Sequence, residues 1–496
     1  MPNKIKDYLK KIDEVNANGE YKDVNDLKDY PYPKWFADAK LGVFIHWGVY
    51  TVPEYLNEWY PRHMYYKGSP INGYHIETYG RKFNYRDFIP MFTAPRFDPR
   101  EWLGLFKESG ARFVMPVAEH HDGFKMYESD INEWNSVNMG PKRDVLGELK
   151  AACEEKGLAF CASSHRAEHY WFMNGGKTLR YDNEVKSGEY PDFYGPAENL
   201  YKSNNWMMLN KNEKNIVPSR EWLEDWLVSS CELIDRYRPS ALFFDWWICH
   251  CEEFYPYTDR FLTYYCNRSR EWGTDADGRK DVCIFYKSDR IPLPPVVLDQ
   301  ERGQLGDIYG KPWQCETSTA KNSWSYTVQN QFKSPEEIIC NFIDVLSKNG
   351  TFCINIGPRA DGSICDRDIN ILKQLGRFTK LNGEAIWDVS TYKVFGEGKE
   401  RQGGMFRENY GYSEGEFRFT QKGGAVYVFA LVPSKNGEYN IKTLASGKGR
   451  LEKEIKSVSL LGYDAKVSYN VAENALRLTA PNPPEDALPL CFKIIC

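Results

Sequence analysis

Four short clusters of histidine and carboxylate residues are the parts of this sequence best suited to chemistry. Each follows an apolar run of strand length, and three have a tryptophan close by. The clusters are Phe44-Ile-His46-Trp-Gly48 with Glu58-Trp59 ten residues on, Glu119-His120-His121-Asp-Gly-Phe124, Ser163-Ser-His165-Arg-Ala-Glu168-His169-Tyr-Trp171, and Asp245-Trp-Trp247. Imidazoles and carboxylates bond hydroxyl groups, and an indole covers the apolar face of a sugar ring. The pattern favours a carbohydrate site.

Asp245 ends the apolar run Ala241-Leu-Phe-Phe and is followed by two tryptophans. An unpaired charge inside a buried strand is costly, so we expect Asp245 at the C-terminal end of that strand, where it opens into a cleft. In a parallel α/β barrel, catalytic residues gather at this end. A carboxylate that only caps the following turn is the alternative.

A hydrolytic metal site is the main competing interpretation, with His46, His120, His121 and Asp245 as ligands. Adjacent histidines on an extended segment point to opposite faces, so we do not expect His120 and His121 to share one ion. The first strand also offers one imidazole rather than a His-x-His pair. The sequence therefore favours a site without a metal, and the metal-dependent barrel hydrolase remains a less favoured alternative.

Apolar runs alternate with amphipathic helical patterns up to about residue 388, which is typical of βα units. The expected strands are 41–47, 112–117, 158–163, the run ending at Asp245, 282–286, 296–298 and 351–356, and the expected helices are 5–17, 101–109, 145–156, 220–237, 335–347 and 366–381. This pattern predicts an α/β fold, a (β/α)8-like TIM barrel over residues 1–388. A polar insertion at 174–215 reads as a long loop over one mouth.

Beyond residue 388 the pattern changes to short alternating strands with Gly and Asn turns, which predicts a β-sandwich over residues 389–496. The sandwich contains none of the eight histidines, which all lie at or before His250. Chemistry that titrates near neutral pH therefore belongs to the barrel. We expect the sandwich to give structural support.

The composition of the chain limits its possible partners and its cellular location. A net charge of -5 excludes a polybasic surface for nucleic acid, and no apolar run is long enough to cross a bilayer. Thirteen cysteines without Cys-x-x-Cys pairs suggest free thiols in a reducing compartment. The charged N-terminus shows no signal peptide, so we expect a cytoplasmic protein, although a chain trimmed of its leader would look the same.

Several motifs occur in one order between about residues 35 and 386. They are Phe44-Ile-His-Trp-Gly48, Glu58-Trp59, His120-His121-Asp-Gly-Phe124, Trp134-Asn-Ser136 with Gly140-Pro-Lys-Arg-Asp144, and Asn349-Gly-Thr-Phe-Cys-Ile-Asn-Ile-Gly-Pro358. As an ordered set they resemble the α-L-fucosidases of glycoside hydrolase family 29. The resemblance implies a barrel followed by a β-sandwich, in agreement with the fold expected from the pattern.

The resemblance also implies roles for individual residues. Asp245 would be the nucleophile of a retaining hydrolysis, forming a glycosyl-enzyme while a second carboxyl group protonates the leaving oxygen. A fucose pocket would be lined by His46, Glu58, Trp59, His120, His121 and Trp134. His165 matches the third-strand position where the family often places another sugar contact.

The identity of the second carboxyl group is less fixed in the family. Some members use a Glu in a Trp-Glu dipeptide, but here that position is Gln314, which cannot transfer a proton. Others use a Glu about a dozen residues earlier, which corresponds to Glu301. We predict Glu301 as the acid/base, with Glu316 in reserve and Asp299 or Glu252 behind it. A salt bridge between Glu301 and Arg302 or Arg290 is the alternative role.

The resemblance implies a fucosylated oligosaccharide or glycoconjugate as substrate, with neither metal nor organic cofactor. The missing Trp-Glu acid indicates a preference for α-1,3/1,4-linked fucose on branched glycans. A fucose-binding protein that has lost catalysis is a second hypothesis, favoured only by Gln314. The sequence predicts no oligomeric state.

Overall fold

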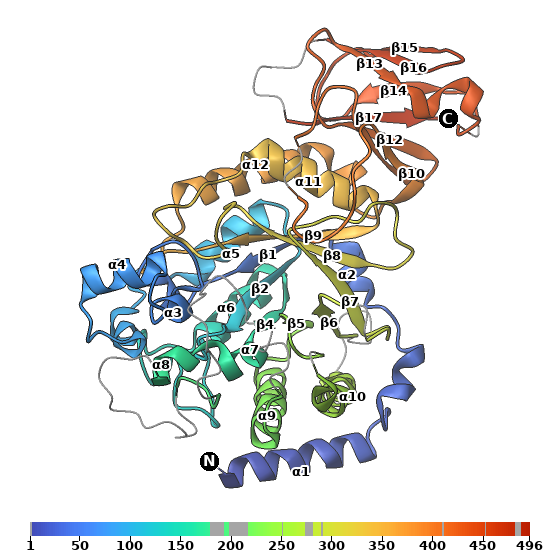
Figure 1. The fold of residues 1–496 in the computed structure, drawn as a ribbon. Coiled ribbons are helices and arrows are strands. Elements are labelled where there is room, and N and C mark those ends of the chain that lie inside the picture. The colour runs from blue at the N-terminus through green and yellow to red at the C-terminus, as the bar shows by residue number, and fades with distance from the viewer. Residues whose placement is uncertain are drawn as a thin grey trace.

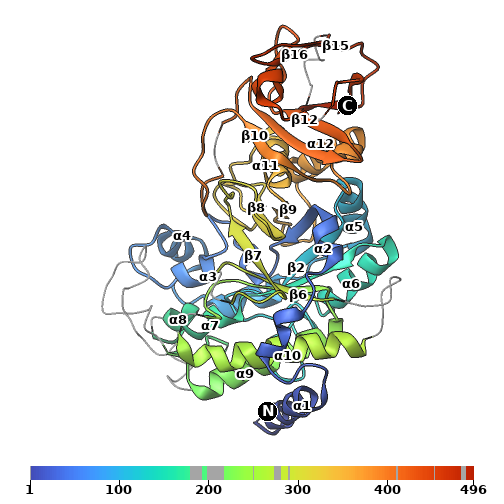
Figure 2. The same cartoon turned by 90° about the vertical axis from the view of Figure 1, so that its right-hand side faces the viewer.

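The computed structural model describes residues 2–178, 193–197, 217–249, 251–272, 281–288, 291–408, 411–451, 453–481 and 488–496. Figure 1 shows a barrel of strands surrounded by helices, with a stack of antiparallel strands beyond α11 and α12. The view turned by 90° shows the same arrangement, with α1 at the opposite end of the molecule from the C-terminal strands (Figure 2).

The barrel consists of parallel strands in the order β1-β9-β8-β7-β6-β5-β4-β2-β3, and pairing of β1 with β2 closes it. β3 and β4 are two parts of one barrel strand, which is interrupted at Cys161. The closed barrel therefore has eight strand positions. The strands are β1 (Leu41–Ile45), β2 (Phe113–Glu119), β3 (Ala159–Phe160), β4 (Ala162–Ser164), β5 (Ala241–Phe244), β6 (Cys283–Tyr286), β7 (Val296–Glu301), β8 (Trp313–Ser318) and β9 (Gly350–Ile356). The expected TIM-barrel class is confirmed.

Helices surround the barrel, and several of them carry clear start or stop signals. They are α1 (Pro2–Asn18), α2 (Lys34–Ala39), α3 (Tyr60–His63), α4 (Pro70–Tyr79), α5 (Pro99–Glu108), α6 (Val145–Lys156), α7 (Arg166–Phe172), α8 (Asn174–Thr178), α9 (Arg220–Tyr237), α10 (Tyr255–Glu271), α11 (Pro335–Ser347) and α12 (Asp366–Asn382). Ser334 and Glu337 form a capping box at the start of α11, and Gly157 ends α6 with a left-handed φ of 66°. Among the described helices, none is long and apolar enough to span a membrane.

The inside of the barrel is a packed apolar core below the polar end. Alternate residues of each strand point inward, so Phe243 on β5 and Phe285 on β6 lie in this core. Phe36 of α2 closes the bottom, with its ring 4.9 Å from that of Phe285. The next inward position after Phe243 is Asp245, which the alternation places at the open, C-terminal end of the barrel.

The C-terminal strands form two antiparallel sheets that face one another. The five-stranded sheet has the order β10 (Ser390–Glu397), β11 (Phe417–Lys422), β12 (Ala425–Ala430), β17 (Leu490–Ile495), β14 (Ser457–Leu460), and the three-stranded sheet has the order β13 (Glu438–Ile441), β16 (Leu476–Thr479), β15 (Ser468–Val471). A shared core joins them, in which the rings of Tyr439 and Phe492 lie 4.8 Å apart. The expected β-sandwich class is confirmed, while the division of the chain at residue 388 stays a prediction.

Most expected elements agree with the structure, and the helices 145–156, 220–237 and 335–347 match to the residue. Three strands were not expected: β8, β10 and β13. β7 also runs three residues beyond its expected end, so that Glu301 is its last residue. Within the expected loop 174–215, residues 174–178 form α8, and most of the remainder lies outside the described residues. None of the thirteen cysteines, all of which lie in the described residues, is assigned to a disulfide bond.

Candidate active site

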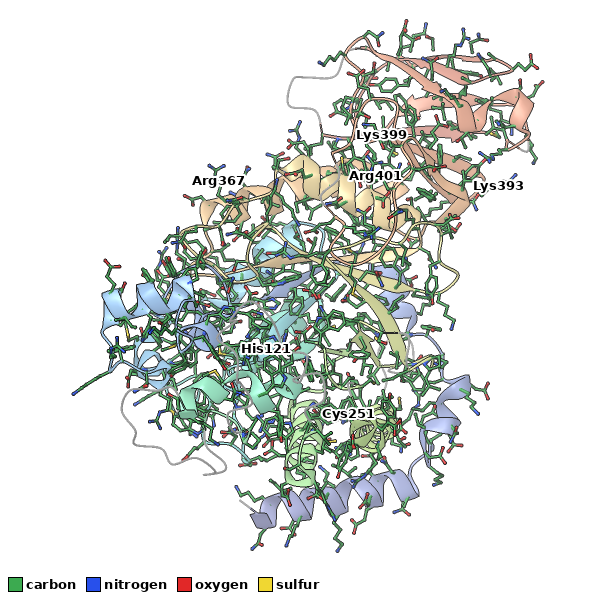
Figure 3. All side chains as sticks on the ribbon, in the orientation of Figure 1. His121, Cys251, Arg367, Lys393, Lys399 and Arg401 are labelled. Atoms are coloured by element: carbon green, nitrogen blue, oxygen red, sulfur yellow. The ribbon has the colours of Figure 1, made fainter. Side chains whose placement is uncertain are left out.

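A cavity of about 270 Å³ opens at the C-terminal ends of the barrel strands. Figure 3 labels His121, one of its lining residues, in the middle of the barrel. The lining residues predicted from the sequence are His46, Glu58, Trp59, His120, His121, His165, Asp245, Glu301 and Glu316. Trp134 is not among them, and its ring packs 4.9 Å from that of Phe193. The lining residues that were not predicted are Glu168, Trp246, Lys287, Trp324 and Phe406.

Asp245 lies at the centre of a hydrogen-bonded and ion-paired cluster. Its Oδ2 is 3.2 Å from His165 Nδ1 and 3.4 Å from His121 Nε2, and its Oδ1 is 3.2 Å from Lys287 Nζ. Burial alone would raise the pKa of the Asp245 carboxyl group, but Lys287 and the two histidines hold that pKa well below its ordinary value. The carboxylate is therefore ionised, as a nucleophile must be.

Lys287 is the central residue that sequence reasoning missed. Its Nζ contacts Oε2 of Glu301 at 2.6 Å and Oε1 of Glu316 at 2.5 Å, besides Asp245. Burial would lower the pKa of Lys287, but these carboxylates raise it well above its ordinary value. The signal in the sequence was the alternation Cys283, Phe285, Lys287, which continues the inward face of β6 one residue beyond the strand.

The shared ammonium group limits how far apart the carboxylates can lie. Asp245 Oδ1 and Glu301 Oε2 lie 3.2 and 2.6 Å from Lys287 Nζ, so these two oxygens are at most 5.8 Å apart. Retaining glycosidases hold their two carboxyl groups about 5–5.5 Å apart, whereas inverting enzymes need about 6.5–9.5 Å. The same contacts place Glu316 Oε1 at most 5.7 Å from Asp245 Oδ1. The spacing suits a retaining mechanism with either glutamate.

Glu301 and Glu316 differ in their access to the cavity mouth. They lie opposite each other on β7 and β8, yet the Glu301 side chain is 11% exposed and that of Glu316 only 2%. Glu301 also accepts a hydrogen bond from the indole N–H of Trp246 at 3.2 Å. Burial raises the pKa of Glu316 well above its ordinary value, despite the opposing effect of Lys287. Glu316 is thus the deeper group, and Glu301 the one nearer solvent.

The remaining acid/base candidates lie away from the cavity lining. Asp299 is fully buried and accepts a hydrogen bond from Gln314 Nε2 at 2.9 Å, and burial raises its pKa to about 7. Glu252 is exposed in a short turn of helix before α10. Of the alternative partners of Glu301, Arg302 pairs instead with Glu408 at 3.2 Å, and Arg290 lies outside the described residues.

Four buried histidines surround Asp245. The rings of His120 and His121 lie 4.3 Å apart and both line the cavity, so the expectation that they point to opposite faces was wrong. The reason is that β2 ends at Glu119 and the chain turns immediately afterwards. Burial lowers the pKa values of His46 and His120 well below the ordinary value, and that of His165 to about 4. These neutral imidazoles suit the hydroxyl groups of a sugar.

His121 differs from the other three histidines because carboxylates surround it. Its Nδ1 lies 3.5 Å from Glu168 Oε2, and its Nε2 faces Asp245. Burial would lower the pKa of His121, but Glu168 and Asp245 raise it. Burial raises the pKa of Glu168 to about 8. Both shifts favour a proton held between His121 and Glu168, beside Asp245.

Indoles and a fixed carboxylate complete the wall. Trp59 and Trp324 line the cavity, and the Trp324 ring lies 5.2 Å from that of His46. Oε2 of Glu58 accepts hydrogen bonds from Ser323 Oγ at 3.0 Å and from the backbone N–H of Trp324 at 2.8 Å. These bonds fix Glu58 and leave its other oxygen for a hydroxyl group.

Two groups of described residues have the spacing of metal ligands: His46, His120 and His165, and His121, His165 and Asp245. Both ring nitrogens of His165 are already engaged, because its Nε2 lies 2.7 Å from Ser163 Oγ. A cation held by Asp245 would also lie beside the Lys287 ammonium and be repelled by it. These contacts suit recognition of an uncharged polar ligand better than a metal.

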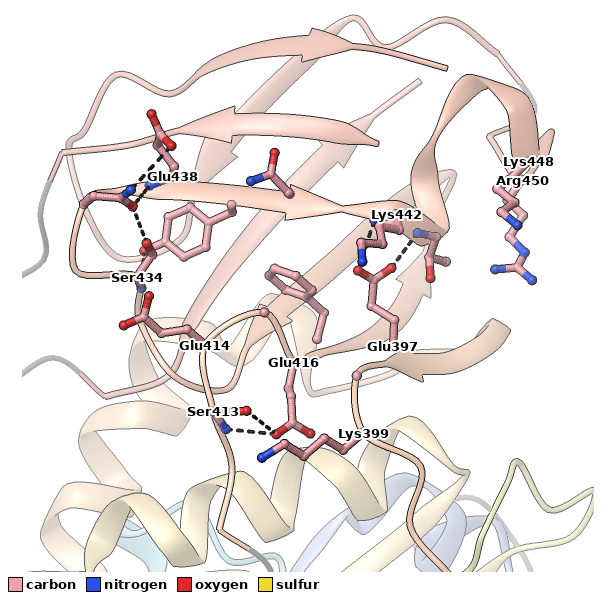
Figure 4. Close-up of a pocket in the computed structure, with 17 residues that line it drawn as sticks. Glu397, Lys399, Ser413, Glu414, Glu416, Ser434, Glu438, Lys442, Lys448 and Arg450 are labelled. Atoms are coloured by element: carbon pink, nitrogen blue, oxygen red, sulfur yellow. Dashed lines mark hydrogen bonds between the residues drawn. The ribbon is translucent and has the colours of Figure 1, made fainter. Parts of the chain in front are cut away.

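A larger hollow of about 920 Å³ lies among the C-terminal strands (Figure 4). Two of its four glutamates are held by the protein: Glu397 accepts the backbone N–H groups of Lys442 and Thr443, and Glu416 accepts the backbone N–H and the hydroxyl group of Ser413. The other two, Glu414 and Glu438, are exposed. Its aromatic residues, Phe417 and Tyr439, are buried. Because none of its lining residues presents an exposed aromatic ring or a buried carboxylate pair, the hollow lacks the features of the barrel cavity.

A closed (β/α)8 barrel with paired carboxylates and indoles at the C-terminal ends of its strands defines a glycoside hydrolase. The family model described as alpha-L-fucosidase matches residues 9–384, and the chain belongs to that family.

Relatives and solved structures of known function match this chain over nearly its whole length. The tissue alpha-L-fucosidase of Homo sapiens is 26% identical over 94% of this chain and 89% of its own length. A solved alpha-L-fucosidase superposes with a TM-score of 0.75 at 26% identity, covering 96% of this chain and 99% of the other. The Thermotoga maritima alpha-fucosidase in complex with fucose gives a TM-score of 0.71 at 26% identity, over 95% and 99% of the two chains.

Proposed function

We propose that this enzyme is an exo-acting, retaining α-L-fucosidase with Asp245 as nucleophile and Glu301 as acid/base. The observation that carries the proposal is the single ammonium group of Lys287 in contact with both carboxylates, which limits their separation to at most 5.8 Å. A cavity of about 270 Å³ is smaller than the ~300–1,000 Å³ pockets of drug-sized ligands, so it suits one terminal sugar.

In the first step, an Asp245 carboxylate oxygen bonds to the anomeric carbon of fucose while the glycosidic bond breaks. The leaving oxygen takes the proton of Glu301, which becomes a carboxylate. In the second step, Glu301 takes a proton from water, the water oxygen bonds to the anomeric carbon, and the bond to Asp245 breaks. Fucose leaves with its original anomeric configuration.

Glu301 is the better acid/base because it is nearer to the cavity mouth, where the rest of the glycan must lie. Its side chain is the more exposed of the two glutamates, and Trp246 orients it. Glu316 is the more buried of the two, and its role in the proposal is to share the ammonium charge of Lys287.

The substrate is a glycan with terminal α-L-fucose. Gln314 stands where other members of the family carry a Trp-Glu acid, and this favours α-1,3/1,4-linked fucose on branched glycans. A fucose-binding protein without catalysis is the second candidate. Its only support in the sequence is Gln314, which cannot transfer a proton. Gln314 donates a hydrogen bond to Asp299 and does not line the cavity, and this weakens the second candidate.

Azide rescue tests the assignments. With an activated aryl fucoside, Asp245→Gly should give β-fucosyl azide, because azide enters the space of the missing nucleophile. Glu301→Gly should give the α-anomer, because azide then attacks the glycosyl-enzyme. An α-product from the Asp245 variant would reverse the roles. Release of fucose by the unaltered enzyme from neither an aryl fucoside nor a Lewis-type oligosaccharide would leave only the binding protein.

A further inference from the structure

A segment that follows β10 reaches back to the mouth of the barrel cavity. Residues 403–408 pair with the chain just after β7: the N–H of Gly404 donates to Gln304 O at 2.8 Å, and the N–H of Phe406 donates to Glu301 O at 2.9 Å. The contact needs glycine, since a Cβ on Gly303 would lie 2.2 Å from Gly404 O. A part of the chain outside the barrel strands thus borders the site.

A buried ion cluster fixes the end of this segment. The Glu408 carboxylate lies 2.6 Å from Lys333 Nζ and 3.2 Å from Arg302 Nη1, and it also accepts a hydrogen bond from Thr317. The side chains of Glu408 and Lys333 are almost completely buried. Charges paired in this way hold the segment rigidly, so Phe406 is presented by a fixed backbone and not by a loose loop.

The segment presents an aromatic ring to solvent at the cavity mouth. Phe406 lines the cavity yet is 61% exposed, and it has a left-handed φ of 58°, a conformation unfavourable for a residue with a Cβ. Trp246 lines the same cavity and is 37% exposed. Single exposed rings are common, but among the described residues these are the two large exposed apolar side chains that border the cavity.

Trp246 and Phe406 both contact Glu301. The indole N–H of Trp246 donates to the side chain of Glu301, and the backbone N–H of Phe406 donates to its carbonyl. If Glu301 protonates the leaving oxygen, that oxygen must come within hydrogen-bond reach of it. The group attached to this oxygen then starts between, or beside, the two exposed rings.

We infer that Trp246 and Phe406 form a subsite for the leaving group, binding the apolar face of the sugar or aryl ring to which fucose is attached. The inference rests on the proposed function, because it takes Glu301 as the acid. Flat aromatic faces at an open mouth suit the C–H face of a pyranose or the plane of an aryl ring. Fucose itself lies deeper, among the histidines.

The test compares substrates with and without a ring on the leaving side. In Phe406→Ala, kcat/KM for a fucosyl disaccharide should fall about tenfold, mainly through KM, as expected for loss of one aromatic contact. Hydrolysis of α-L-fucosyl fluoride, whose leaving group has no ring, should stay within about twofold, and so should inhibition by free fucose. Phe406→Trp, which keeps an aromatic ring at this position, should retain the disaccharide activity that Phe406→Ala loses.

The matched control is Tyr469→Ala, which removes an exposed ring on β15, away from the barrel cavity. This variant should hydrolyse both substrates at the rates of the unaltered enzyme. Unaltered disaccharide kinetics in Phe406→Ala, or an equal fall for fluoride and disaccharide, would overturn the subsite and leave the fucosidase proposal intact. An unaltered enzyme that releases fucose from neither substrate would overturn both.

Discussion

The ammonium nitrogen of Lys287 lies 3.2 Å from Oδ1 of Asp245, deep at the polar end of the barrel. The same nitrogen contacts the carboxylates of Glu301 and Glu316, so one buried ammonium group is ion-paired with three carboxylates. Because the low dielectric strengthens these interactions, Lys287 acts to lower the pKa of both Asp245 and Glu316. It keeps Asp245 charged while burial keeps the pKa of Glu316 high.

Replacing Lys287 by methionine should move the acid limb of the kcat/KM–pH profile to higher pH. Asp245 attacks only when ionised, and its pKa is now held well below the ordinary value by Lys287, His121 and His165. Without the ammonium group that pKa rises, so activity is lost at a higher pH as the solution is acidified. Lys287→Arg keeps the charge and should keep the limb near its original position. An unmoved limb in Lys287→Met would show that Lys287 does not control Asp245.

Glu301→Gln and Glu316→Gln should separate the two candidate acids. The first should lower kcat/KM for a fucosyl disaccharide about 10²–10⁴-fold, because a poor leaving group needs its proton, and should affect α-L-fucosyl fluoride far less. The second should lower activity on both substrates to a similar extent, because Glu316 acts through Lys287. The reverse pattern would make Glu316 the acid.

Glu408→Gln should destabilise the protein by about 3–5 kcal/mol, because it leaves the cations of Arg302 and Lys333 without their buried partner. Urea denaturation measures the loss. Lys321→Gln removes one partner of an exposed pair with Glu337 and should cost only about 0–1 kcal/mol. Equal costs for the two variants would mean that the cluster does not anchor residues 403–408.

Extended dialysis against a chelator should leave kcat and KM unchanged. The proposed steps use Asp245 and Glu301 alone, and the Lys287 ammonium lies where it would repel a cation bound at Asp245. Activity that is lost on chelation and restored by one divalent metal would favour the barrel metallohydrolase instead.

Six of the helices and the apolar strands of this fold could be predicted because each carries a strong local signal, whereas α2, α3, α4, α7, α8 and α10 were not expected. α9 is capped by Ser219 and ends at Tyr237, one residue before Arg238 and its following proline, and β5 is continuously apolar. β8 was missed because Gln314 and Glu316 interrupt its apolar pattern with residues that point into the barrel. The strands that carry the site's polar groups are therefore the ones least recognisable as buried strands.

The candidate site was predictable where several chemical groups cluster in sequence, as at His120-His121 and Asp245. Lys287 stands alone after its strand and gave no cluster to notice. Phe406 could not be found at all, since its place depends on pairing between segments about a hundred residues apart. Trp134 shows the opposite limit: a motif residue whose ring packs on Phe193 and does not line the cavity.

The contact between residues 403–408 and β7 has a consequence for the order of events during synthesis. A chain leaving the ribosome completes β9 and α12 before Phe406 and Glu408 have been made. The barrel strands can then pair around the cavity before Glu408, the anionic partner of Arg302 and Lys333, has been synthesised. Phe406 is therefore the last of the residues that line the cavity to be synthesised.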